Sequence, residues 1–182
     1  MSGAEPVVVR GDRVTLRPWR MDEFDLWYGA RLASAGDATV NPSGGPDPDR
    51  LRERMERSGV RHGPAMDLVI EVDGRAAGEI GVYDVPEEDL GPGEFFFGIG
   101  LFDAADRGRG IGSEATRLLT DWLFEHADAI RIRSSTAVTN TPMRRVFERL
   151  GWQPVGTENR WGIEWARYVL DRPTWEGRAS AD

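Results

Sequence analysis

Apolar and polar residues are distributed along the chain in blocks that predict a single α/β domain. Short apolar or alternating blocks predict strands, at 13–18, 66–72, 76–84, 94–102, 130–138, 153–159 and 163–170. Longer blocks predict helices, at 22–34, 49–59, 111–126 and 141–150. The expected fold class is therefore α/β (α+β), with a mixed central sheet of about seven strands flanked by helices. One domain should span residues 1–182, with a flexible tail at 177–182.

The helix predicted at 111–126 follows a glycine-rich turn, Arg107–Gly112, and an apolar strand that should lie in the middle of the sheet. Such a turn can bind phosphate, because glycine allows close backbone approach and the start of a helix favours negative charge. Arg107 and Arg109 add two cationic side chains there. Glycine-rich turns are also common in proteins that bind no phosphate, so the turn alone leaves both interpretations open.

Two nucleotide-binding motifs do not fit this turn. A dinucleotide-binding fingerprint beginning at Gly108 would need glycine where the chain has Ser113, and an acidic residue where it has Arg131 and Arg133. A nucleoside-triphosphatase loop would end in Gly-Lys-Ser or Gly-Lys-Thr, and the chain contains no lysine. Both classes are therefore excluded.

A second segment carries a pattern of its own, because Asn140 opens the helix predicted at 141–150 and Gly151 ends it. Taken with the turn, it resembles the GNAT acyltransferases. The two signatures of that family are matched by Arg107, Gly110 and Gly112 in the first and by Asn140, Leu150, Gly151 and Trp152 in the second. The segment at 14–19 is similar to the opening strand of the family, and the segment at 162–176 resembles its RimJ/RimL-like branch.

The resemblance implies a GNAT fold that uses acetyl-CoA as co-substrate and no metal. The amides of residues 108–113 would hold the pyrophosphate, and the end of the strand at 94–102 would pair with the pantetheine arm. Asn140 would contact that arm or the departing sulfur, or would be only a helix cap. The implied cofactor-binding residues are Leu101, Phe102, Arg107, Gly108, Arg109, Gly110, Ile111, Gly112, Ser113 and Asn140.

The implied reaction is N-acetylation of a primary amine by direct attack in a ternary complex. The amine must lose a proton before it attacks, so a carboxylate base is expected. Glu94 is the first candidate, because it begins the strand that would bind the cofactor, and Glu79 on the preceding strand is the second. Either could instead be an exposed carboxylate at a strand end.

The sequence departs from the family pattern at the acid that would protonate the leaving thiolate. Phe147 stands where many members of the family have tyrosine. The remaining hydroxyl donors near the expected site are Ser134, Ser135, Thr136 and Tyr168. Thiolate release also needs little help, because a thiol has a pKa near 8.5 and is a fair leaving group.

Composition narrows the function further. A net charge of −8 argues against a nucleic-acid partner, and the chain has no apolar run long enough to span a membrane. The absence of cysteine excludes disulfides and cysteine catalysis, and two histidines are too few for a histidine-based metal site. A start without an apolar signal region predicts a cytoplasmic protein.

The sequence leaves the acceptor open. It could be a protein N-terminus or a small molecule such as a polyamine, an amino acid or an aminoglycoside-like compound, and a homodimer is also compatible with the resemblance. The acidic balance would suit a cationic amine. The alternative function is a catalytically silent CoA-binding sensor or interaction protein, because the usual tyrosine acid is missing.

Overall fold

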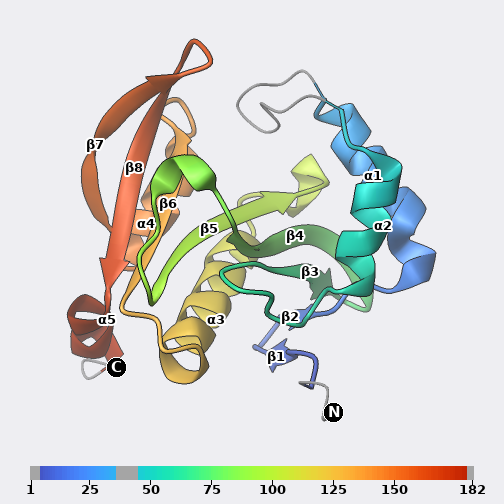
Figure 1. The fold of residues 1–182 in the computed structure, drawn as a ribbon, viewed down its shortest axis with the longest axis horizontal. Helices are drawn as coiled ribbons and strands as arrows, with labels where there is room; N and C mark the ends of the chain where they lie inside the picture. Colours follow the sequence, from blue (N-terminus) through green and yellow to red (C-terminus); the bar gives the residue numbers. More distant parts are fainter. Residues whose placement is uncertain (1–4, 36–44, 180–182) are drawn as a thin grey trace.

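The computed structural model describes residues 5–35 and 45–179, which form one eight-stranded sheet with helices on both faces (Figure 1). The strand order is β1-β2-β3-β4-β5-β6-β8-β7. The strands are β1 (Val9–Arg10), β2 (Val14–Arg17), β3 (Met66–Val72), β4 (Arg75–Tyr83), β5 (Glu94–Leu101), β6 (Arg131–Ala137), β7 (Gln153–Arg160) and β8 (Ile163–Asp171). The helices are α1 (Phe24–Ala33), α2 (Pro48–Glu56), α3 (Ile111–His126), α4 (Thr141–Arg149) and α5 (Arg172–Ala179). Short 3₁₀ helices are η1 (Met21–Glu23), η2 (Pro86–Glu88) and η3 (Ala104–Asp106).

Strands β5 and β6 form the parallel pair of the sheet, and they diverge after a short contact. Their register runs only from Glu94 opposite Arg131 to Phe96 opposite Arg133. Ser134 donates from Oγ to the carbonyl oxygen of Phe97 at 3.0 Å, where this register ends. Beyond this point β5 continues beside β4 and β6 continues beside β8, so the two halves of the sheet separate (Figure 1).

The main core lies between α3 and the sheet. Ile111, Leu119 and Leu123 of α3 are buried in one cluster with Ile80 of β4 and Phe97 of β5. These side chains follow the three- and four-residue spacing that predicted the helix, so burial of this stripe explains why the segment is helical. The packing also fixes the start of α3 next to the point where β5 and β6 diverge (Figure 1).

The opposite face of β3 and β4 is covered by α1 and α2. Trp19 and Trp27 stack with ring centroids 4.5 Å apart and an interplanar angle of 9°. Leu51 and Met55 of α2 complete this second cluster against Val69 of β3. The cluster places α1 beside β4, where one of the predicted catalytic carboxylates lies.

The predicted strands and α-helices agree with the structure in type and in order. One strand, one α-helix and the short 3₁₀ helices were not predicted. The sheet has eight strands because of β1, which was not predicted. This strand has only two residues, too few to show an alternating pattern. Helix α5 begins directly after β8 and extends to Ala179, so the first residues of the segment expected as a tail are helical, while 180–182 lie outside the described residues. In the described part of the chain, no helix is both long and apolar enough to cross a bilayer.

Candidate active site

The divergence of β5 and β6 opens a cleft of about 1810 Å³. Its walls come from β4, β5, β6, the start of α3, α4 and the hairpin of β7 and β8. The predicted site residues that line it are Glu79, Leu101, Arg107, Gly108, Gly110, Gly112, Ser113 and Asn140. The predicted residues that do not line it are Glu94, Phe102, Arg109 and Ile111.

The glycine-rich turn has the backbone geometry of an anion-binding site. Gly108 and Gly110 have φ values of 73° and 82°, in the left-handed region that favours glycine. The first bond inside α3 runs from the Glu114 amide to the Gly110 carbonyl at 3.0 Å, so the amides before Glu114 have no acceptor within the helix. A Cβ on Gly112 would meet no atom within 4 Å, which leaves open space above these amides.

The two arginines of the turn have different surroundings. Arg107 lines the cleft, whereas the Arg109 guanidinium lies 3.4 Å from Asp106. Asp106 is buried and also accepts from Arg75, and these hydrogen bonds hold the pKa of the Asp106 carboxyl below its usual value. Ile111 is buried in the main core and can contribute to the site only through its backbone.

The end of β5 differs by one residue from the prediction. Leu101 lines the cleft, but the Phe102 amide donates to the carbonyl of Ala77 at 3.0 Å and its ring packs 6.1 Å from that of Trp19. The backbone of Phe102 therefore belongs to the pairing with β4. The strand edge that faces the cleft lies before it, from Phe97 to Leu101.

Asn140 lines the cleft and caps α4 at the same time. Its Oδ1 accepts from the Met143 amide at 3.3 Å, which satisfies one donor at the start of the helix. Among the described residues, nothing accepts a hydrogen bond from its side-chain NH₂ group. The cap thus leaves a donor in the cleft, and the two roles considered for Asn140 are compatible.

Glu94 lies at the opposite end of β5 from the cofactor-binding turn. Arg133 contacts its carboxylate at 2.7 Å and Arg131 at 3.3 Å, and the Gly91 amide donates to it as well. Burial alone would raise the pKa of Glu94, but these donors outweigh burial and hold it below the usual value. Glu94 and Leu101 are the two ends of β5 and lie seven residue steps apart, roughly 23 Å at 3.3 Å per step. Its surroundings are those of a structural ion pair that joins β5 to β6.

Glu79 lines the cleft, and hydrogen bonds hold only one of its two carboxylate oxygens. Its Oε2 accepts from Trp27 Nε1 at 2.6 Å and from the Arg31 guanidinium at 2.9 Å. Its Oε1 accepts no hydrogen bond from the described residues. Glu79 stands opposite Gly100 of β5, within the part of that strand that has left β6. The carboxylate is therefore oriented by two donors and keeps one oxygen free to accept a proton.

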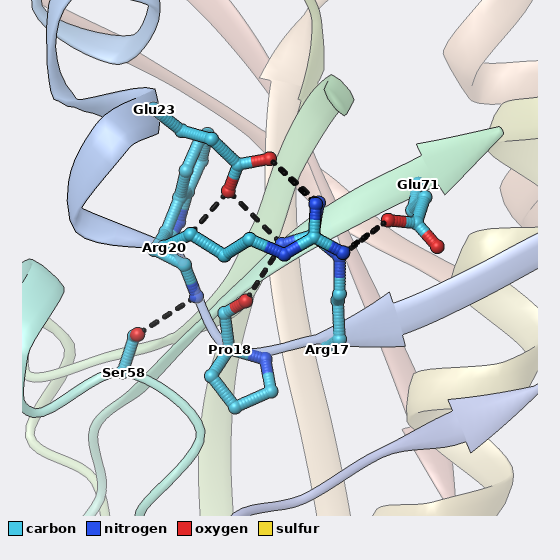
Figure 2. A network of polar contacts seen from close by, with 7 residues as sticks. Arg17, Pro18, Arg20, Glu23, Ser58 and Glu71 are labelled. Carbon is cyan, nitrogen blue, oxygen red and sulfur yellow. Dashed lines mark hydrogen bonds and ion pairs between the residues drawn. The ribbon is translucent and has the colours of Figure 1, made fainter. Parts of the chain in front are cut away.

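A network around Arg17 fixes the position of α1, and with it Trp27 and Arg31 (Figure 2). The Arg17 guanidinium bonds to Glu71 on β3 at 2.6 Å, to Glu23 in η1 at 2.6 Å and to the carbonyl of Pro18 at 2.9 Å. Burial of Glu23 would raise its pKa, but the bonds from Arg17 and from the Arg20 amide lower it below the usual value. The network ties the entry of α1 to the sheet.

Tyr83 is a cleft residue that the sequence analysis did not select. It lies on the same face of β4 as Glu79, with Gly81 between them. A Cβ on Gly98 would come within 2.8 Å of its ring, so the ring lies across that bare backbone. Burial raises the pKa of the Tyr83 hydroxyl, and the nearby Glu79 raises it further, so this hydroxyl stays protonated. The glycines of β4 and β5 were a sequence signal for this contact, because a glycine inside a strand often marks the close approach of another group.

The structure separates the hydroxyl groups considered as proton donors. Ser135 and Thr136 line the cleft, and Ser134 does so while it donates to the Phe97 carbonyl. Tyr168 is buried, bonds to Arg144 and Glu148, and does not line the cleft. Phe147 is buried in the main core, and it also lines the cleft. Within 5–35 and 45–179, no group of three or more acidic or histidine side chains could hold a metal ion.

Comparison with known proteins is consistent with this geometry. Residues 13–153 match the family model described as the acetyltransferase (GNAT) domain, and no curated protein matches the chain. RimJ of Mycobacterium smegmatis, solved in complex with CoA-disulfide, has a TM-score of 0.76 and 22% identity, over 97% of this chain and 95% of that chain. Aminoglycoside acetyltransferase AAC(6')-Ib, solved with coenzyme A, has a TM-score of 0.73 and 20% identity, over 91% and 99%.

A GNAT-family acetyltransferase from Bacillus anthracis has the same fold, with a TM-score of 0.70 and 17% identity over 91% of this chain and 98% of that chain. These identities are low and show a shared fold. The family model, in contrast, covers well over half of the sequence, including the glycine-rich turn and Asn140. The chain belongs to the GNAT acetyltransferase family.

Proposed function

We propose that this chain transfers the acetyl group of acetyl-CoA to a primary amine, with Glu79 as the general base. Membership of the GNAT family supports acetyltransferase activity. The observation that carries the finer proposal is the environment of Glu79. Trp27 and Arg31 hold one carboxylate oxygen, and the other faces a cleft beside the unpaired part of β5.

The described residues fit acetyl-CoA, which supplies the activated acyl group. The amides that start α3 and the Arg107 side chain would hold the pyrophosphate, because both favour negative charge. The β5 edge from Phe97 to Leu101 has backbone groups that could pair with the amides of the pantetheine arm. The RimJ and AAC(6')-Ib structures share this fold and were solved with CoA-disulfide and coenzyme A, which supports binding of a CoA compound by this chain.

Glu79 would act on the acceptor before the bond is made. A primary amine is an ammonium ion at neutral pH and must lose a proton to become a nucleophile. Glu79 takes this proton directly or through one water molecule. The nitrogen then attacks the acyl carbon, the C–N bond forms and the C–S bond breaks. The nitrogen releases its second proton to solvent as the amide forms, and the CoA thiolate takes a proton from solvent. The chain has no cysteine that could carry the acyl group between two steps.

Initial rates measured while acetyl-CoA and an amine are both varied test this proposal. Direct attack in a ternary complex predicts intersecting double-reciprocal lines and no acetylated protein by mass spectrometry. Parallel lines with an acetylated protein would contradict direct attack. If calorimetry shows CoA binding but no amine in a broad panel is acetylated, the chain is instead a CoA-binding sensor or interaction protein.

A further inference from the structure

The hairpin of β7 and β8 turns through two residues, Trp161 and Gly162, between the paired residues Arg160 and Ile163. Both turn residues have positive φ, 53° for Trp161 and 75° for Gly162. A two-residue hairpin loop with two positive φ values corresponds to a type I′ turn, whose first position favours asparagine, aspartate or glycine. A tryptophan in the left-handed region is strained. The conformation of the turn therefore does not explain why position 161 is a tryptophan.

The Trp161 side chain is also not part of the core. It is 57% exposed and lines the cleft, whereas Trp165 beneath it is only 9% exposed. The two rings meet edge to face, with centroids 6.3 Å apart and an interplanar angle of 85°. The Arg160 guanidinium lies 5.9 Å from the centroid of the Trp161 ring. These contacts position an indole that still has much of its surface open to the cleft.

The hairpin that carries Trp161 is anchored by a buried ion cluster. Glu88 of η2 has a fully buried carboxylate that contacts the guanidinium groups of Arg160 and Arg167. Glu158 contacts the same two arginines, at 2.6 and 3.5 Å. Separating these charges would leave a buried charge without a partner, which is strongly unfavourable. The hairpin and the connection between β4 and β5 are therefore held together, and the indole is presented on a fixed support.

The charged side chains on this side of the cleft are already paired with one another. Arg31 contacts Glu79, Arg54 contacts Asp67, and Arg160 contacts Glu88 and Glu158. On this side, near β4 and the hairpin, Asp84 is the remaining charged side chain that lines the cleft, and it has no ion pair among the described residues. One exposed carboxylate is a weak basis for selecting a polycation. The exposed indole of Trp161 offers an apolar surface for contact on this side.

We propose that Trp161 determines acceptor specificity by packing against an apolar, preferentially aromatic, body of the amine that is acetylated. The inference rests on the proposed function, and it names the acceptor class of the same cleft. An aromatic ring on the substrate gains contact area and ring-to-ring attraction from the open indole surface. A polycation such as spermidine gains some contact from its methylene and ammonium groups but no ring-to-ring attraction, and the Arg160 guanidinium already lies at the indole. We therefore expect 2-phenylethylamine to be a better acceptor than ethylamine or spermidine.

Trp161→Asn tests the role of the ring without harming the turn. Asparagine suits the first position of a type I′ turn, so the variant should be at least as stable as the wild type while it lacks the indole. We expect KM for 2-phenylethylamine to rise about tenfold, with kcat, CoA affinity and KM for ethylamine unchanged. Trp161→Phe should retain most of the wild-type affinity.

An equal KM for 2-phenylethylamine in the wild type and in a stable Trp161→Asn variant would overturn the inference. A wild-type preference for spermidine that weakens with salt would overturn it as well, because charge would then set specificity. Calorimetry of 2-phenylethylamine with the CoA-saturated protein makes the same comparison without turnover. Ring-dependent binding without acetyl transfer would refute the proposed function and leave the role of Trp161 intact.

Discussion

Trp27 Nε1 donates to Glu79 Oε2 at 2.6 Å, and this bond joins a helix on one face of the sheet to a carboxylate in the cleft. Trp27 is fully buried and stacks on Trp19, so its indole cannot turn away from Glu79. Arg31, on the same helix, contacts the same oxygen. The base proposed for the reaction is thus oriented by the packing of α1.

Glu79→Gln should lower kcat about 100-fold, in line with general-base contributions of about 10² to 10⁴, with CoA affinity unchanged. Glutamine has nearly the same shape and can still accept from Trp27, so the loss would report on the proton and not on packing. The matched variant is Glu94→Gln, which should keep kcat within about threefold and lower the melting temperature, because Arg131 and Arg133 lose a charged partner. The reverse result in two folded variants, measured by steady-state kinetics, would make Glu94 the base.

Gly112→Glu should abolish CoA binding while the protein stays folded. Gly112 lies in the first turn of α3 with open space around its Cβ position, so a side chain fits the fold but occupies the cleft. Replacing a helical glycine should also stabilise α3 by about 0.5–1 kcal/mol. Calorimetry with CoA and thermal unfolding measure the two effects, and Gly112→Ala is the control, with a smaller loss of affinity. Unchanged CoA affinity in Gly112→Glu would exclude the turn as the phosphate site.

Phe147→Tyr should not raise kcat, although it restores the hydroxyl that is common in the family. The Phe147 ring is 1% exposed and packs 4.8 Å from Trp152 and 5.0 Å from Tyr168. The residue also lines the cleft, so an added hydroxyl costs about 1–3 kcal/mol of stability only if it finds no partner there. We expect kcat to stay unchanged because removal of the proton from the amine, and not protonation of the thiolate, limits the reaction. Denaturant unfolding and steady-state rates measure both consequences. A faster enzyme would show that protonation of the thiolate limits the reaction.

The Arg17 network should make the protein less stable in acid. The pKa of Glu23 is lower in the folded state than in the unfolded state, so its contribution is complete above the unfolded value of about 4.3 and is lost as the pH falls through the folded value. The lowered pKa values of Glu94, Asp106 and Glu114 act in the same direction. We expect the melting temperature to fall as the pH drops from about 5 to about 3.

Glu23→Gln isolates one part of this effect. It should destabilise the protein by about 2 kcal/mol at pH 7, because the largely buried Arg17 keeps only Glu71 as a charged partner, and it should cost almost nothing near pH 3. Glu53→Gln, at an exposed pair with Arg57, is the control and should change stability by less than about 0.5 kcal/mol. A Glu23→Gln effect of equal size at both pH values would mean that packing, and not charge, is responsible.

The sequence predicted the fold, and most of the residues predicted to bind the cofactor line the cleft, whereas of the two predicted carboxylates only Glu79 lines it. The strand, the turn before Ile111 and the cap at Asn140 are local patterns, and local geometry determines where they lie. The choice between Glu94 and Glu79 depends on which carboxylate lines the cleft and on how its arginine partners hold it. Those partners, Arg131 and Arg133 for one and Arg31 for the other, come from distant segments, and residue spacing does not predict them.

Trp27 and Tyr83 were missed for the same reason. In the sequence, each has the pattern of an ordinary buried aromatic residue. The packing of α1 over β4 brings Trp27 to Glu79, and the packing of Tyr83 over Gly98 brings its ring to the cleft. The sequence also could not reveal the positive φ of Trp161 or its exposure. These features appear only when the register of β7 and β8 is known.

The divergence of β5 and β6 also affects the solubility of the protein when CoA is absent. From Phe97 to Leu101, β5 presents a sheet edge in the interior of the molecule, and unpaired strand edges promote association with other chains. A molecule that pairs with this edge would shield it and, because it binds only the folded state, would stabilise the fold by about 2.7 kcal/mol at a concentration of about 100 Kd. Solubility and melting temperature should therefore both rise with CoA, and the enzyme without CoA should be the form that aggregates first.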